Sequence, residues 1–222
     1  MPKDFTLRPE DLLHIYRQGL FPMADSFEDP EFAIIEPYIR GVLPIFDLHI
    51  PHSLRKLVRK FRYDVRVNSN FEQVMLACAE SRPGRENTWI NQDILALFCG
   101  LNRDGHAHSI EVYEDDKLIG GLYGLAMGQV FCGESMFSRA PNVSKVALVH
   151  LCARLWRGGF KMLDAQFPNE HLEQFGAKTM LQDEYIAAMT PLLTQPASFI
   201  LPQDEEKLVS DYLEARADAS VF

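Results

Sequence analysis

The sequence predicts an α+β fold in which one mixed β-sheet carries helices on its faces. Three segments in the middle of the chain have strand-like apolar patterns and are separated only by short turn signals, which is typical of an antiparallel meander. A long helix, a buried strand and two more helices follow them. The predicted meander strands are residues 108–114, 117–127 and 130–137.

The N-terminal part of the chain predicts a small domain over residues 1–45. A short helix is expected over residues 8–19, because Pro9 suits a first helical turn and Gly19 suits a helix end. Residues 24–44 are rich in Pro and Gly and are therefore expected to form loops.

The larger part, residues 46–201, is expected to hold the sheet and most of the helices. Helices are predicted over residues 53–60, 71–80, 91–102, 169–175 and 182–189, with a long one from Asn142 or Ser144 to Gly158. Further strands are predicted over residues 62–67 and 161–166, and a polar loop over residues 81–87. The acidic tail, residues 202–222, suggests disorder.

Composition restricts the class of protein. A net charge of −9 argues against nucleic-acid binding driven by total charge. No apolar run reaches the length of a membrane span and the N-terminus lacks a signal-peptide layout, so a cytoplasmic protein without membrane contact is expected. The four cysteines are scattered and are expected to be free thiols.

One stretch is locally basic. It contains Arg55, Lys56, Arg59 and Lys60 on a single predicted helix. Such a face is compatible with one phosphate-rich ligand, and equally with an ordinary solvated helix surface.

The glycine-rich strands at residues 120–124 and 131–138 indicate a pocket. Glycine weakens a strand, so its repeated use marks close backbone approach, a bulge or a bend. Glu134 lies among small and aromatic residues, and a buried carboxylate is rare unless it is paired or used. Trp89, Phe131 and Met136 are compatible either with a pocket wall or with a filled core.

A second polar spot follows the long helix. Asp164 and Gln166 would point to the same face of a strand. The pair is consistent with a functional site and also with a structural hydrogen bond at a strand end.

Other chemistries have weaker support. Ser135 lacks the second glycine of a nucleophile elbow, and Cys132 has no recognisable His–acid partner. His106 and His108 could share a strand face, but no further ligands complete a metal site, so none is expected.

Nine short motifs carry a resemblance to a known family. They are YRQGLFPM at residues 16–23, ENTWI at 86–90, GHAHSIE at 105–111, GGLYG at 120–124, FCGESMFS at 131–138, SKVAL at 144–148, LDAQ at 163–166, HL at 171–172 and FGA at 175–177. In number and order they strongly resemble the bacterial leucyl/phenylalanyl-tRNA–protein transferase family, from about residue 8 to about residue 200.

The resemblance implies a small N-terminal domain and a catalytic domain with the acyl-CoA N-acetyltransferase-like (GNAT-like) fold. It implies an aminoacyltransferase that moves Leu, Phe or Met from aminoacyl-tRNA to the N-terminal Arg or Lys of proteins in N-end rule degradation. No cofactor is implied, and a monomer is expected.

The resemblance also assigns site residues. Asp164 and Gln166 match positions that tune the site and hold the acceptor amine, and Glu134 matches a glutamate near the acceptor. The donor pocket would be lined by Trp89, Leu122, Phe131, Ser135 and Met136, and the tRNA contacted by Arg55, Lys56, Arg59 and Lys60.

One departure leaves alternatives open. Many relatives carry a Trp-rich segment where this chain has Ile34-Ile35 before Pro37, which predicts weaker stacking on the terminal adenine. A non-catalytic binder of N-terminal Arg or Lys therefore stays possible. A coenzyme-A-dependent acetyltransferase is a further alternative, although residues 138–142 lack a pyrophosphate-binding loop.

Overall fold

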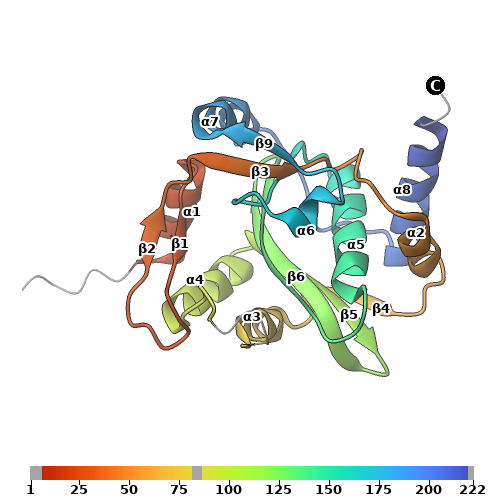
Figure 1. Ribbon diagram of the computed structural model, residues 1–222, viewed down its shortest axis with the longest axis horizontal. Helices are drawn as coiled ribbons and strands as arrows, with labels where there is room; N and C mark the ends of the chain where they lie inside the picture. The colour runs from red at the N-terminus through yellow and green to blue at the C-terminus, as the bar shows by residue number, and fades with distance from the viewer. Residues whose placement is uncertain (1–6, 82–86, 220–222) are drawn as a thin grey trace, which may run out of the picture.

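The main element of the computed structural model, which describes residues 7–81 and 87–219, is a seven-stranded sheet (Figure 1). Its strand order is β4-β5-β6-β7-β8-β3-β9. In that order the strands are Asp64–Val67, Ala107–Glu114, Lys117–Met127, Val130–Ser138, Met162–Asp164, Ile39–Leu43 and Lys178–Leu181. Only the β7–β8 pair is parallel, so the sheet is mixed, as the sequence predicts.

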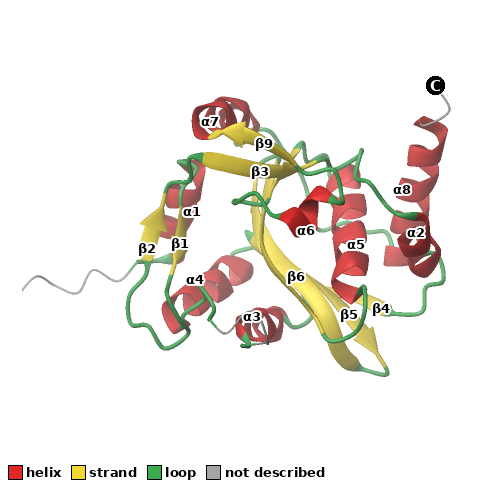
Figure 2. Cartoon of the chain, viewed as in Figure 1, coloured by secondary structure: helices red, strands yellow, loops and turns green. Residues whose placement is uncertain are grey.

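Helices cover the sheet on both sides (Figure 2). One hydrophobic core lies under α2 (His52–Val58), α5 (Val143–Arg157) and α8 (Glu205–Ala219). A second core lies under α1 (Pro9–Arg17), α3 (Phe71–Ala79) and α4 (Gln92–Arg103). The α+β class with one mixed sheet is therefore confirmed.

Smaller elements complete the chain. A two-stranded sheet of β1 (Phe21–Met23) and β2 (Ala33–Ile35) follows α1. After β8 come α6 (Glu170–Glu173), β9, α7 (Gln182–Met189) and the 3₁₀ helix η1 (Thr190–Leu192).

Most predicted helices and strands lie within a few residues of their expected bounds. α4 begins as its sequence indicates, because the Asn91 side chain caps it by accepting a hydrogen bond of 2.9 Å from the Ile94 N–H. α7 matches its prediction, residues 182–189. The predicted polar loop over residues 81–87 lies largely outside the described residues.

Two expectations were wrong. Residues 24–44 were expected to be loops, yet they contain β2 and β3, and β3 lies inside the main sheet between β8 and β9. The acidic tail was expected to be disordered, yet residues 205–219 form α8. This helix buries Leu208, Val209, Tyr212 and Leu213 against α5, while Glu206 and Glu214 are exposed on its surface. The division into domains stays a prediction.

Other expectations concern membrane spans, cysteines and metal sites. Within residues 7–81 and 87–219, no helix combines the length and hydropathy that a membrane span requires. The four cysteines are free thiols. No cluster of three or more His, Cys, Asp or Glu side chains in the described part of the chain could hold a metal ion.

Candidate active site

A cavity opens where strands β7 and β8 separate. Their parallel pairing runs only from Val130–Met162 to Cys132–Asp164. Beyond it, β8 ends, while β7 continues beside β6. The space between them is a cavity of about 320 Å³.

Glu134 enters this cavity because β7 contains a bulge. Along the β6–β7 pair, Tyr123 faces Ser135 and Gly124 faces Gly133, so Glu134 has no partner residue on β6. A bulge inserts one residue and re-aims its side chain, and bulges are common next to active sites. The strand alternation that the sequence suggests is broken at this residue.

Gly124 makes the close strand approach possible. A Cβ atom there would lie 2.3 Å from the Cys132 carbonyl oxygen and 2.4 Å from the Phe131 ring. No other residue fits without displacing backbone. The sequence-based interpretation of this glycine, close backbone approach, is thus confirmed at Gly124.

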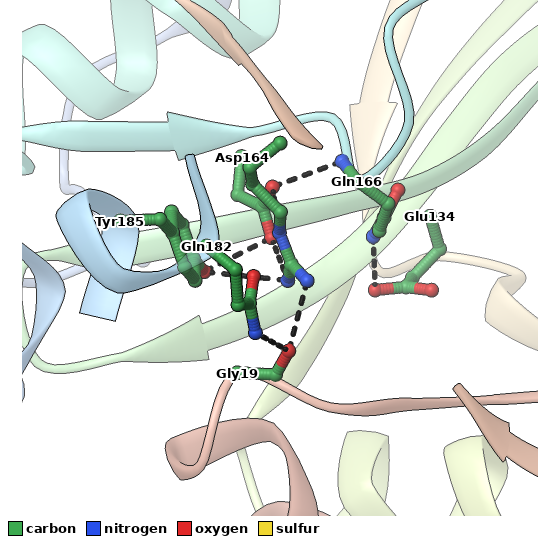
Figure 3. Close-up of polar contacts among 7 residues, drawn as sticks. Gly19, Glu134, Asp164, Gln166, Gln182 and Tyr185 are labelled. Carbon is green, nitrogen blue, oxygen red and sulfur yellow. Dashed lines mark hydrogen bonds and ion pairs between the residues drawn. The ribbon is translucent and has the colours of Figure 1, made fainter. Parts of the chain in front are cut away.

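Glu134 and Gln166 contact each other across the cavity (Figure 3). The Gln166 Nε2 amide donates a hydrogen bond of 2.9 Å to Glu134 Oε1. Burial raises the pKa of Glu134 from 4.5 to about 8, and the hydrogen bond from Gln166 offsets only part of that rise. At neutral pH the Glu134 carboxyl group is therefore mostly protonated.

Gln166 is held in a strained backbone conformation. Its φ is 56°, in the left-handed region that non-glycine residues rarely occupy. Its backbone N–H donates a hydrogen bond of 2.9 Å to Asp164 Oδ1. Such strain persists only where surrounding contacts enforce it, and it is concentrated at functional sites.

Asp164 is paired with a residue that the sequence analysis did not single out. Arg40, on β3, donates to Asp164 from Nε (2.9 Å to Oδ1) and from Nη2 (2.6 Å to Oδ2), and both side chains are fully buried. The Tyr185 hydroxyl donates a further bond of 3.1 Å to Oδ2. Each carboxylate oxygen thus accepts two hydrogen bonds.

The same arginine reaches the end of α1. Its Nη1 donates a hydrogen bond of 2.9 Å to the Gly19 carbonyl oxygen, which also accepts one of 3.0 Å from Gln182 Nε2 (Figure 3). The available signal in the sequence was one charged residue inside the apolar stretch Ile39–Leu43. It was missed because residues 24–44 were interpreted as loops.

A second cavity of about 210 Å³ shares a wall with the first. It is bounded by β1 and by the chain after β8, including Phe21 and Phe167. Both cavities are lined by Trp89, Glu134, Ala165, Gln166 and Asn169. The two spaces therefore meet at the Glu134–Gln166 contact.

The structure brings most of the predicted site residues together. Trp89, Leu122, Ser135 and Met136 line the larger cavity with Glu134, Asp164 and Gln166. Phe131 does not: it is fully buried and stacks on Phe199 at 5.3 Å, because it points into the core under α5 and α8. Asn169 and His171 also line the larger cavity and were not predicted as site residues.

The basic residues lie elsewhere. Arg55 and Lys56 are on α2 and Arg59 and Lys60 directly follow it. α2 packs against α5, and in Figure 1 α5 lies between α2 and the strand β6. None of the four lines either cavity.

Comparison with known proteins identifies the family. The family model described as "Leucyl/phenylalanyl-tRNA protein transferase" matches residues 42–190. Two relatives are named leucyl/phenylalanyl-tRNA–protein transferase. The one from Maricaulis maris is 47% identical over 88% of this chain and 91% of its own length. The one from Phenylobacterium zucineum is 49% identical over 85% of this chain and 86% of its own length. The chain belongs to the leucyl/phenylalanyl-tRNA–protein transferase family.

A further member of the family, from Hyphomonas neptunium, is 48% identical over 86% of this chain and 74% of its own. Among solved structures, L-PGS from Bacillus licheniformis overlaps 71% of this chain and 65% of its own with a TM-score of 0.44 and 12% identity, which adds nothing to the assignment. The family resemblance predicted from the nine motifs is confirmed.

Proposed function

We propose that this chain transfers leucine, phenylalanine or methionine from aminoacyl-tRNA to the N-terminal Arg or Lys of acceptor proteins, marking them for N-end rule degradation. The observation that carries the proposal is family membership, because relatives about half identical over most of the chain share one name. The bulge at Glu134 and the two cavities meeting there supply a site of suitable chemistry.

The reaction is an aminolysis of an ester. The acceptor's α-amine, once neutral, attacks the aminoacyl carbonyl carbon, a C–N bond forms, and the C–O bond to the tRNA ribose breaks. The proton that the new amide loses passes to the leaving ribose oxygen. An aminoacyl ester is already activated, so positioning and electrostatics supply the catalysis without ATP.

The larger cavity suits the donor side chain. Leu122 and Met136 present apolar surface there and Trp89 presents a ring. A slot of this kind rejects side chains branched at Cβ by roughly 1–3 kcal/mol per methyl-sized mismatch.

Glu134 and Gln166 then face the acceptor. A neutral amide is no base, so Gln166 orients the amine through its carbonyl oxygen. The Glu134 carboxylate pairs with the acceptor's guanidinium or ammonium group, which restores its ionised form in the complex. The helix α2 and the residues after it contact the tRNA backbone, and the protein acts in the cytoplasm as a monomer.

Transfer of labelled leucine tests the proposal. Leucyl-tRNA is incubated with peptides that differ only in an N-terminal Arg, Lys or Ala. We expect labelling of the Arg and Lys peptides alone. Equal labelling of all three would contradict the acceptor role of Glu134, and no labelling at all would refute the transferase assignment. Thermal stabilisation by acetyl-CoA and not by an aminoacyl-adenosine analogue would favour an acetyltransferase instead.

A further inference from the structure

The strongest unassigned feature is the buried Arg40, which no motif included. It is fully buried, and its guanidinium contacts three separate parts of the chain. It pairs with Asp164 on β8, donates to the Gly19 carbonyl after α1, and lies 4.3 Å from the centre of the Tyr185 ring on α7.

The carboxylate of Asp164 has no free acceptor position for a substrate amine. Oδ1 accepts from Arg40 Nε and from the Gln166 backbone N–H, while Oδ2 accepts from Arg40 Nη2 and the Tyr185 hydroxyl. Burying an ion pair costs desolvation energy, so its presence at 0% exposure needs a reason other than stability.

That reason lies two residues further on. The Gln166 N–H bond to Asp164 Oδ1 closes the turn in which Gln166 takes its positive φ. This turn aims the Gln166 amide at Glu134. If the carboxylate rotated, the turn would relax and the amide would leave the junction of the two cavities.

We propose that Arg40 is a positioning residue for the transfer reaction: through the carboxylate of Asp164 it holds Gln166 in the left-handed turn that presents its amide to the acceptor amine. Asp164 is the link in this arrangement and touches no substrate. Because Arg40 also lies 5.1 Å from the centre of the Phe21 ring, it fixes one wall of the smaller cavity relative to Gln166. The catalytic consequence rests on the proposed function.

Two conservative variants test it. Arg40→Lys keeps the charge and removes the bidentate contact, because an ammonium group cannot reproduce the guanidinium fork. Arg154→Lys is the matched control. Arg154 is also buried, and it donates hydrogen bonds to the Phe199 carbonyl and the Glu205 carboxylate. These contacts join α5 to the C-terminal segment and lie outside both cavities.

The expected result separates positioning from folding. Arg40→Lys should lower kcat roughly tenfold to a hundredfold with less than about a twofold change in donor KM. Arg154→Lys should lose about as much thermal stability as Arg40→Lys but should leave kcat unchanged. Equal kcat losses in the two variants would overturn the proposal.

A readout that needs no activity comes from hydrogen exchange. Mass spectrometry of the peptide spanning residues 163–168 should show the Gln166 amide exchanging at least about tenfold faster in Arg40→Lys than in the wild type. Unchanged exchange there would refute the positioning role even if transfer fell. If the wild type transferred nothing, the exchange result would still decide whether Arg40 holds this turn.

The apolar double variant Arg40→Met with Asp164→Leu removes the cost of a lone buried charge. This double variant should fold, but it should not catalyse transfer. Full recovery of kcat in this folded variant would also overturn the proposal.

Discussion

Replacing Glu134 with glutamine should stabilise the protein while impairing acceptor binding. At pH 7 the carboxyl group is ionised in the unfolded chain but mostly protonated in the fold, where burial raises its pKa from 4.5 to about 8. Taking up that proton on folding lowers the free energy of unfolding by about 1.36 kcal/mol for each pH unit between the ordinary pKa and pH 7. Because Glu134 is partly exposed, we reduce the total to about 2–3 kcal/mol. Glutamine can still accept from Gln166 and carries no such cost.

The sign of the effect depends on pH. Because the folded pKa is raised, the wild type matches Glu134→Gln below about pH 4.5 and falls progressively behind as the pH rises through about 8. At pH 7, thermal unfolding followed by circular dichroism should show a midpoint roughly 5–10 °C higher in Glu134→Gln. The gap should shrink toward zero at pH 4.5.

The matched control is Glu111→Gln. Glu111 is fully buried on β5, which β6 separates from β7 in the same sheet. Its carboxylate accepts hydrogen bonds from the backbone N–H groups of Ser69 and Asn70 and from the Ser69 and Ser109 hydroxyls. An amide NH₂ would oppose those donors, so this variant should lose roughly 1–3 kcal/mol. If Glu134→Gln destabilised the protein in the same way, or its gain were equal at pH 5 and pH 8, the reasoning about Glu134 would be refuted.

Three further predictions concern catalysis, tRNA and the C-terminus. The logarithm of kcat/KM for an Arg peptide should rise between pH 6 and 7 with a slope of about 2, because Glu134 and the acceptor α-amine each lose a proton. In Glu134→Gln only the amine titrates, so a slope near 1 is expected. A slope unchanged from the wild type would contradict the role of Glu134. In filter-binding assays, the double variant Lys56→Glu, Lys60→Glu should bind tRNA more weakly, and the slope of its log affinity against log salt concentration should fall by about 2. The control Lys117→Glu, on the β5–β6 hairpin, should change neither quantity. Equal effects of the two variants would show that α2 is not part of the tRNA-binding surface. Deleting residues 203–222 should leave a chain that is unfolded by circular dichroism, because α8 covers the core under α2 and α5. A folded product would show that the fold does not need the apolar surface that α8 buries.

The sequence predicted the regular elements well where local signals were strong. The meander strands and the helices α4, α5 and α7 have clear periodicity or end signals, and they appear where expected. β3 and β9 were missed because each is short and is stabilised by pairing with the other, at a distance along the chain that no local pattern records.

The site was predictable as a set of residues but not as a geometry. Glu134, Asp164 and Gln166 were identified, since family motifs contain them. Their roles, which the resemblance also assigned, stay predictions. Their geometry was not predictable, because it depends on the bulge at Glu134 and on Arg40, which is 124 residues from Asp164 in the sequence. The resemblance assigned Phe131 to the pocket, whereas its side chain is buried in the core, because an apolar strand residue alone does not show whether it lines a cavity or fills a core.

The position of β3 has a consequence for synthesis on the ribosome. Residues 39–43 leave the exit tunnel early, yet their partners are residues 163–164 and 178–181, so the strand has no neighbour until about 120 more residues have been made. Until then the Arg40 side chain has no Asp164 to pair with, so its guanidinium group stays in water. A charge that is costly in the finished core is therefore fully hydrated for most of synthesis, and the main sheet is complete only once β9 has been made.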